Sequence, residues 1–224
     1  MKLGWPGRAA EKLHWVHAQK KSDWEGLEPE TRNIWQRTAA ATHGILTPGN
    51  VITLIGSILV AYGLLVFVSG NLYVGFLLLA LGRIADIADG NVSHRTGTKS
   101  TVGAAVDAGA DWTQLAITTP ILFIQNALPL AAALLIALPK LVDTFSSIAA
   151  KVRHKRMNAS REGKMGGGII WLGLCLFMLA SAQAGNLLTL ITNAAWITTI
   201  AGSIIHAPAS LEYFRTGFLN RTQK

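Results

Sequence analysis

Long apolar blocks dominate the chain from residue 46 onward, and several are long enough to cross a membrane. A spanning helix needs about 20 predominantly apolar residues. Six stretches meet this length, at 48–68, 72–95, 101–124, 129–151, 168–184 and 187–207. The pattern predicts an all-α integral membrane protein with six transmembrane helices, arranged as three hairpins.

The leader before the first apolar block is polar and rich in tryptophan, with Trp5, Trp15, Trp24 and Trp35. Tryptophan favours the headgroup region because its ring is apolar and its N–H is polar. We predict an amphipathic interfacial helix, broken near Glu28-Pro29; the alternative is a loosely ordered tail. The expected organisation is this segment at 1–44, a six-helix domain at 45–215 and a cytoplasmic tail at 216–224.

The joints between the blocks alternate between basic joints and joints without basic residues. The joints at 69–71, 125–127 and 183–186 contain no Lys or Arg, whereas those at 94–99 and 151–164 and the C-terminal tail are basic. The positive-inside rule therefore places both termini and both basic loops in the cytoplasm of a cell-membrane protein. The net charge of +8 is therefore explained by membrane topology and by contact with anionic lipid. It does not indicate nucleic-acid binding.

Four aspartates interrupt the second and third apolar blocks, at Asp86, Asp89, Asp107 and Asp111. A charge within a span costs at least ~2.5 kcal/mol, and four carboxylates would repel one another unless a cation lay among them. Spacings of three and four place each pair on one helix face. With a rise of about 1.5 Å per residue, both pairs lie ~9–10 Å below the same membrane surface. This predicts an all-oxygen site for two divalent cations, Mg²⁺ or Mn²⁺.

The spacing of these residues resembles a known signature. The segment Asp86-Ile-Ala-Asp89-Gly90-Asn-Val-Ser93-His94 is followed after eight residues by Gly103, and then by Asp107 and Asp111. It is similar to the motif D-x-x-D-G-x-x-A-R, eight residues, G-x-x-x-D-x-x-x-D of the CDP-alcohol phosphatidyltransferases. Asn50-Val-Ile-Thr53 resembles a second, weaker family element, with Gly49 inserted after Pro48. Ser93 and His94 depart from the family's alanine and arginine, although Arg95 follows directly.

The resemblance implies metal-dependent transfer of a phosphatidyl group from CDP-diacylglycerol to an alcohol, with release of CMP, in phospholipid biosynthesis. It implies that Asp86, Asp89, Asp107 and Asp111 hold the metals and that Asp111 is the general base. It also implies a homodimer and a CDP-binding set. The CDP-binding candidates are Asn50, Thr53, Gly90, Ser93, His94, Arg95, Gly103 and Asp107.

The acceptor is expected to carry a phosphate, because six Lys or Arg residues gather at 151–164 and clustered cations recognise phosphate. The candidates are Arg153, Arg156, Arg161 and Lys164. Ordinary topological charge is the alternative explanation. Gly163-Lys164 also resembles an element of phosphatidylglycerophosphate synthases, which favours glycerol 3-phosphate first and inositol phosphate second. The sequence Asp107-Ala-Gly-Ala-Asp111-Trp112 differs from the D-P-L-A-D-K usual in those enzymes.

Two other functions fit part of the pattern. A divalent-cation transporter also needs carboxylates within the membrane, but it predicts acids near the midplane and in the outer half. A non-catalytic scaffold would not need all four aspartates. Elsewhere, Lys140 and Asp143 are predicted to pair on one helix face, with lining of a polar cavity as the alternative, and His206 fits either role.

Overall fold

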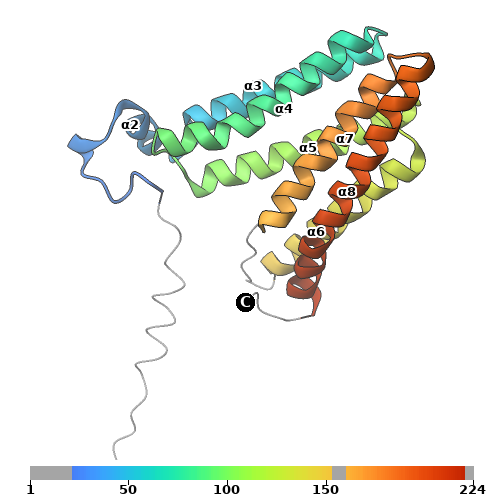
Figure 1. Cartoon of the computed structure of the whole chain (residues 1–224). Coiled ribbons are helices and arrows are strands. Elements are labelled where there is room, and N and C mark those ends of the chain that lie inside the picture. Colours follow the sequence, from blue (N-terminus) through green and yellow to red (C-terminus); the bar gives the residue numbers. More distant parts are fainter. Residues whose placement is uncertain (1–21, 153–159, 220–224) are drawn as a thin grey trace, which may run out of the picture. The chain divides into compact units, whose positions relative to one another are not determined.

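The computed structural model describes residues 22–152 and 160–219, and these residues form helices without any strand (Figure 1). A 3-10 turn, η1 (Pro29–Thr31), precedes seven α-helices. They are α2 (Ile34–Ala41), α3 (Pro48–Val68), α4 (Leu72–Arg95), α5 (Thr101–Ile124), α6 (Leu130–Val152), α7 (Arg161–Ala180) and α8 (Gly185–Phe218). The all-α prediction is confirmed for this part of the chain.

Four of the described helices are long and apolar enough to cross a membrane: Pro48–Val68, Leu130–Ala150, Glu162–Ala180 and Gly185–Phe218. They indicate a multi-pass membrane protein. The aspartate-bearing helices α4 and α5 have the required length, with 24 residues each, but they are not among the four. Their acids and other polar residues lower the mean hydropathy or raise the charge, so composition alone does not establish six spans.

The chain divides into two compact units, and α3, α4 and α5 contribute residues to both. The described part of unit 1 comprises residues 22–57 and 84–111. Unit 2 comprises residues 58–83 and 112–219 within the described range.

Unit 1 is held together by contacts between the polar leader and the joint that follows α4. Asp23 N–H donates to the Lys99 carbonyl at 3.1 Å, and Lys99 N–H donates to the Asp23 carboxylate at 3.3 Å. The Gln36 amide donates to the Gly97 carbonyl at 3.3 Å, and Trp24 is buried. The leader residues from 22 onward are therefore docked against the turn between the two aspartate-bearing helices, and the loosely ordered alternative is wrong for them.

The predicted interfacial helix is not established. Residues 1–21 lie outside the described residues, and the remainder of the leader holds only η1 and the eight-residue helix α2. Asn33 caps α2 through a reciprocal pair of hydrogen bonds with Gln36. The break predicted near Pro29 coincides with η1, because proline has no N–H to continue a helix from the preceding segment.

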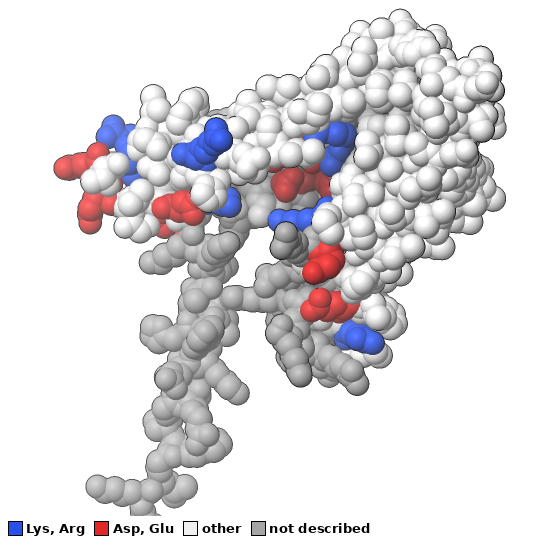
Figure 2. All heavy atoms as spheres, viewed as in Figure 1, with Lys and Arg blue, Asp and Glu red and all other residues white. Residues whose placement is uncertain are grey.

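Unit 2 contains most of the apolar core. Leu79, Leu122, Ile136 and Leu174 are fully buried, and α8 packs along α6 and α7 (Figure 1). The α3 and α4 backbones nearly touch, because a Cβ placed on Gly63 would lie 2.8 Å from the Leu79 nitrogen. Small residues permit such approach between membrane helices. Figure 2 shows a broad surface of this unit without charged side chains toward the turn between α7 and α8.

The bounds of the last two spans differ from those predicted. α7 begins at Arg161, seven residues before the expected start at 168, because Ser160 caps it by accepting from Gly163 N–H at 3.0 Å. Arg161–Lys164 therefore form the first helical turn and are not loop. α8 continues through Pro208 to Phe218, whereas the expected end was 207. Pro208 is exposed, so its ring lies on the outer side of the helix.

Candidate functional site

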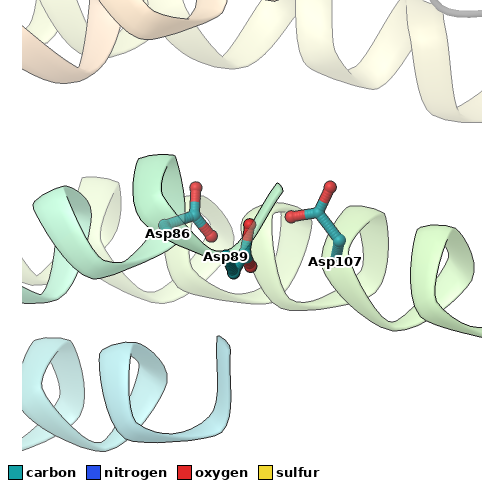
Figure 3. Close-up of side chains that lie close together, drawn as sticks. All are labelled: Asp86, Asp89 and Asp107. Carbon is teal, nitrogen blue, oxygen red and sulfur yellow. The ribbon is translucent and has the colours of Figure 1, made fainter. Parts of the chain in front are cut away.

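Three of the four predicted aspartates converge in unit 1. One carboxylate oxygen each from Asp86, Asp89 and Asp107 lies within 4.8 Å of the other two. Figure 3 shows the three side chains turned toward a common space, two from α4 and one from α5. Three carboxylates at this separation suit a hard divalent cation, which prefers oxygen ligands. The described residues contain no other group of three or more His, Cys, Asp or Glu side chains in such an arrangement.

The three carboxylates differ in exposure, and this gives the site a direction. Asp89 is 6% exposed, Asp86 is half-buried and Asp107 is exposed. The spacing of three along α4 aligns Asp86 with Asp89 on one face. The cluster therefore has a closed side at Asp89 and an open side at Asp107, from which a ligand can enter.

The closed side is held by Thr53 on α3. Its hydroxyl donates to the Asp89 carboxylate and also lies 3.1 Å from the Gly49 carbonyl. The single hydroxyl proton favours the carboxylate, because a hydrogen bond to a charged acceptor is stronger. Thr53 is buried. In the structure its hydroxyl orients the Asp89 carboxylate, and its predicted contact with CDP stays a prediction.

Asp111 is not part of the three-carboxylate group. It follows Asp107 by one turn of α5 and is half-buried. The sequence spacing placed all four acids on one site, whereas the structure brings together three and leaves Asp111 one turn beyond them.

The predicted CDP-binding residues fall into two sets. Gly90, His94 and Arg95 are exposed, and a Cβ added to Gly90 would meet no atom within 4 Å. Asn50 instead makes internal bonds, donating to the Gly44 and Ile45 carbonyls at 3.0 and 2.8 Å.

Ser93 and Gly103 also face neighbouring residues. The Ser93 hydroxyl lies where a Cβ on Gly49 would be, and a Cβ on Gly103 would lie 3.1 Å from the Asn50 amide oxygen. These residues shape the junction of α3, α4 and α5 within unit 1. Gly90, His94 and Arg95 are thus more exposed than Asn50, Ser93 and Gly103, and Asp107, the remaining candidate, is exposed as well.

The acceptor candidates are only partly described. Arg153 and Arg156 lie outside the described residues, as does the side chain of Arg161. Lys164 is exposed on the first turn of α7.

The predicted pairing of Lys140 with Asp143 is wrong. Asp143 instead pairs with His206 of α8, with Nε2 and Oδ2 2.7 Å apart. Helical spacing makes Lys140 and Asp143 neighbours along α6, but the contact across to α8 prevails.

Arg83 is a charged residue that was not among the predicted site residues. It lies on α4, three residues before Asp86. Its guanidinium stacks over Trp171 of α7 at 4.2 Å from the ring centroid and donates to the Gln114 side chain of α5 at 3.0 Å. Its position in the sequence could have identified it as a residue of interest, because it is a cation inside an apolar block, one turn before the first aspartate.

Comparison with known proteins identifies a family. A family model described as CDP-alcohol phosphatidyltransferase matches residues 46–201. An uncharacterized protein of Aquifex aeolicus (strain VF5) is 42% identical over 62 residues, which cover 28% of this chain and 32% of that protein. The aligned part thus spans about a third of the relative's length. No solved structure matches the chain.

Proposed function

The chain belongs to the CDP-alcohol phosphatidyltransferase family, and we propose that it transfers a phosphatidyl group from CDP-diacylglycerol to an alcohol in phospholipid biosynthesis. The observation that carries the proposal is the convergence of Asp86, Asp89 and Asp107 within 4.8 Å. In the reaction, the acceptor oxygen bonds to the phosphatidyl phosphorus, the bond from that phosphorus to the CMP oxygen breaks, and CMP leaves.

The donor set fits a divalent cation, Mg²⁺ or Mn²⁺. Asp86, Asp89 and Asp107 would hold the first ion, and Asp111 with Asp107 would contribute to a second. When bound, such cations would neutralise the diphosphate of the donor and polarise the phosphorus under attack. The chain's own contribution is to fix the ligands, since Thr53 sets the orientation of the Asp89 carboxylate.

Asp111 is the proposed general base. Because it lies outside the three-carboxylate group, it is not one of the three side chains that would hold the first ion. A half-buried carboxylate one turn beyond the metal ligands can accept the proton of the acceptor hydroxyl as the new bond forms.

Gly90, His94 and Arg95 are the proposed contacts for the CDP group. The absence of atoms around a Gly90 Cβ position leaves room for a flat ligand to approach the α4 backbone. His94 and Arg95, in the last turn of α4, supply donors for the diphosphate. Asn50, Ser93 and Gly103 would act behind them by keeping α3, α4 and α5 together.

The proposed acceptor is a phosphorylated polyol, glycerol 3-phosphate first and inositol phosphate second. Lys164, exposed on the first turn of α7, is the described member of the proposed phosphate-binding set, with Arg153, Arg156 and Arg161 as the others. We further propose that α3 to α8 form six spans, that both termini lie in the cytoplasm of the cell, and that the protein acts as a homodimer.

The decisive experiment incubates the purified full chain with CDP-diacylglycerol, Mg²⁺ or Mn²⁺, and a panel of alcohols and polyol phosphates. Metal-dependent release of CMP together with a new phospholipid supports the proposal. Replacement of Asp89 by Asn should abolish both products, because the most buried ligand loses its charge. Absence of CMP with every acceptor and metal would overturn the proposal.

A divalent-cation transporter was the main alternative, and the family assignment gives it no support. Liposomes containing the protein and a metal-sensitive dye provide a direct comparison. Uptake of Mn²⁺ without any CMP release would favour transport over transfer.

A further inference from the structure

Unit 2 contains a polar cluster of its own. Asp143 of α6, His206 of α8 and the Gly163 carbonyl of α7 form a chain through the imidazole ring. His206 Nε2 lies 2.7 Å from Asp143 Oδ2, and Nδ1 lies 3.0 Å from Gly163 O. The side chains of His206 and Asp143 are only 3% and 13% exposed. Three helices are thus joined by one buried side chain.

The two hydrogen bonds determine where the protons lie. A carbonyl oxygen only accepts, so Nδ1 of His206 must carry a proton and donate it to Gly163. Nε2 then meets Asp143 in one of two states: an imidazolium donating to a carboxylate, or a neutral ring accepting from a protonated carboxyl group. In both states the pair holds one shared proton and has no net charge, which suits its burial.

The pair fixes the first turn of α7 against α8. A Cβ on Gly166 would lie 2.7 Å from the backbone nitrogen of His206, so the two backbones are in contact one turn after Gly163. Tyr213 of α8 adds a second connection, because its hydroxyl oxygen accepts from Ser160 N–H at 3.3 Å. Ser160 in turn caps α7 by accepting from Gly163 N–H.

We propose that the Asp143–His206 pair is a positioning element for the acceptor, acting through the first turn of α7. That turn carries Lys164, which directly follows the carbonyl that His206 holds. The inference rests on the proposed function, in which Lys164 binds the acceptor phosphate. Asp143 and His206 touch neither substrate; they fix the position and direction of the backbone from which Lys164 extends.

Two variants of one side chain test the proposal. In Asp143→Asn the amide N–H donates to a neutral Nε2, and the bond from Nδ1 to Gly163 persists. In Asp143→Leu, which has a similar shape, Nε2 loses its partner. We expect Asp143→Leu to raise KM for the acceptor about tenfold, the loss typical of one charge-assisted hydrogen bond. KM for CDP-diacylglycerol should stay unchanged in Asp143→Leu. In Asp143→Asn the acceptor KM should stay close to that of the unaltered protein.

A double-mutant cycle with Lys164→Gln separates positioning from general destabilisation. If the pair acts through the Lys164 turn, Asp143→Leu should raise the acceptor KM little further once Lys164 is replaced, because interacting sites are not additive. Ile204→Ala serves as the control, because Ile204 is exposed and lies on α8, the helix that carries His206. Additive effects, or equal changes in both KM values, would overturn the inference.

Nitrogen-15 NMR of the histidine ring gives a readout that does not depend on activity. The unaltered protein and Asp143→Asn should both show a hydrogen-bonded Nδ1–H for His206, and Asp143→Leu should lose it. Persistence of that signal in Asp143→Leu would contradict the proposed coupling. If the unaltered protein releases no CMP with any acceptor, the proposed function fails, whereas the NMR comparison still tests whether Asp143 sets the ring.

Discussion

The Ser93 hydroxyl of α4 fills the space that a side chain at Gly49 of α3 would need. A Cβ added to Gly49 would lie 1.9 Å from the Ser93 hydroxyl oxygen and 3.2 Å from the Asp89 carbonyl. Both positions depart from the family pattern, which has no residue inserted after the proline and has alanine where this chain has serine. The glycine makes room for the serine, and α3 keeps its close approach to the helix that carries Asp86 and Asp89.

Gly49→Ala should lower stability and activity because the Ser93 hydroxyl must leave its rotamer. We expect a loss of about 1–2 kcal/mol in the free energy of unfolding, as for moderate overpacking. The double variant Gly49→Ala/Ser93→Ala removes the clashing oxygen and should recover most of the loss. Detergent-solubilised thermal melts of the four proteins in the cycle measure this. An equal loss in the single and double variants would show that the hydroxyl is not the obstacle.

Gly90→Ala should leave the fold intact and impair donor binding. The added methyl group meets no protein atom within 4 Å, and alanine is the better helix former. If the CDP group lies against this surface, the same methyl group should raise KM for CDP-diacylglycerol about tenfold or more. The melting temperature should not fall. Unchanged kinetics in Gly90→Ala would place the nucleotide elsewhere.

Thr53→Val should reduce the affinity for the divalent cation, because the Asp89 carboxylate loses the hydroxyl that orients it. Loss of such an outer partner typically lowers metal affinity or activity about 10–100-fold. A titration of activity against Mg²⁺ or Mn²⁺ measures the shift in half-saturation. Thr53→Ser keeps the hydroxyl and is the matched control. If Thr53→Val and Thr53→Ser need the same metal concentration, the hydroxyl has no orienting role.

The helices that carry the site could be predicted from the sequence, because hydrophobic blocks and basic joints define them. The predicted bounds 48–68, 72–95 and 101–124 coincide with α3, α4 and α5. The convergence of Asp86, Asp89 and Asp107 was also predicted, since a short joint makes two consecutive helices antiparallel neighbours. Relationships between helices distant in sequence were not predictable. The pairing of Asp143 with His206 depends on how α8 packs on α6. Between the consecutive helices α3 and α4, the close approach of Gly49 to Ser93 was not predictable either, because the spacing along the chain does not give interhelical distances.

The glycines at 163–168 show the same limit. Gly163 was assigned to the basic loop at 151–164 and Gly168 to the start of the span at 168–184, because the spans were placed by the apolar blocks. Glycine has a low helix propensity. In the structure, Gly166 nevertheless lies inside α7 where its backbone meets α8, and the close packing that its small size permits offsets this cost. Helix propensity describes one segment at a time and contains no information about this contact.

Gly166 and Gly168 therefore make a matched pair for the last prediction. A Cβ on Gly166 would lie 2.7 Å from the backbone nitrogen of His206 and 2.8 Å from the Gly202 carbonyl oxygen. A Cβ on Gly168 would meet nothing within 4 Å. Gly166→Ala must push α7 from α8 and should lower stability by about 1–3 kcal/mol. Gly168→Ala should raise it by up to ~1 kcal/mol, since alanine restricts the unfolded chain. Thermal melts compare the two directly.

Because the α7–α8 contact also holds the turn of Lys164, Gly166→Ala should raise the acceptor KM and Gly168→Ala should not. Equal behaviour of the two variants would contradict the close approach of these helices.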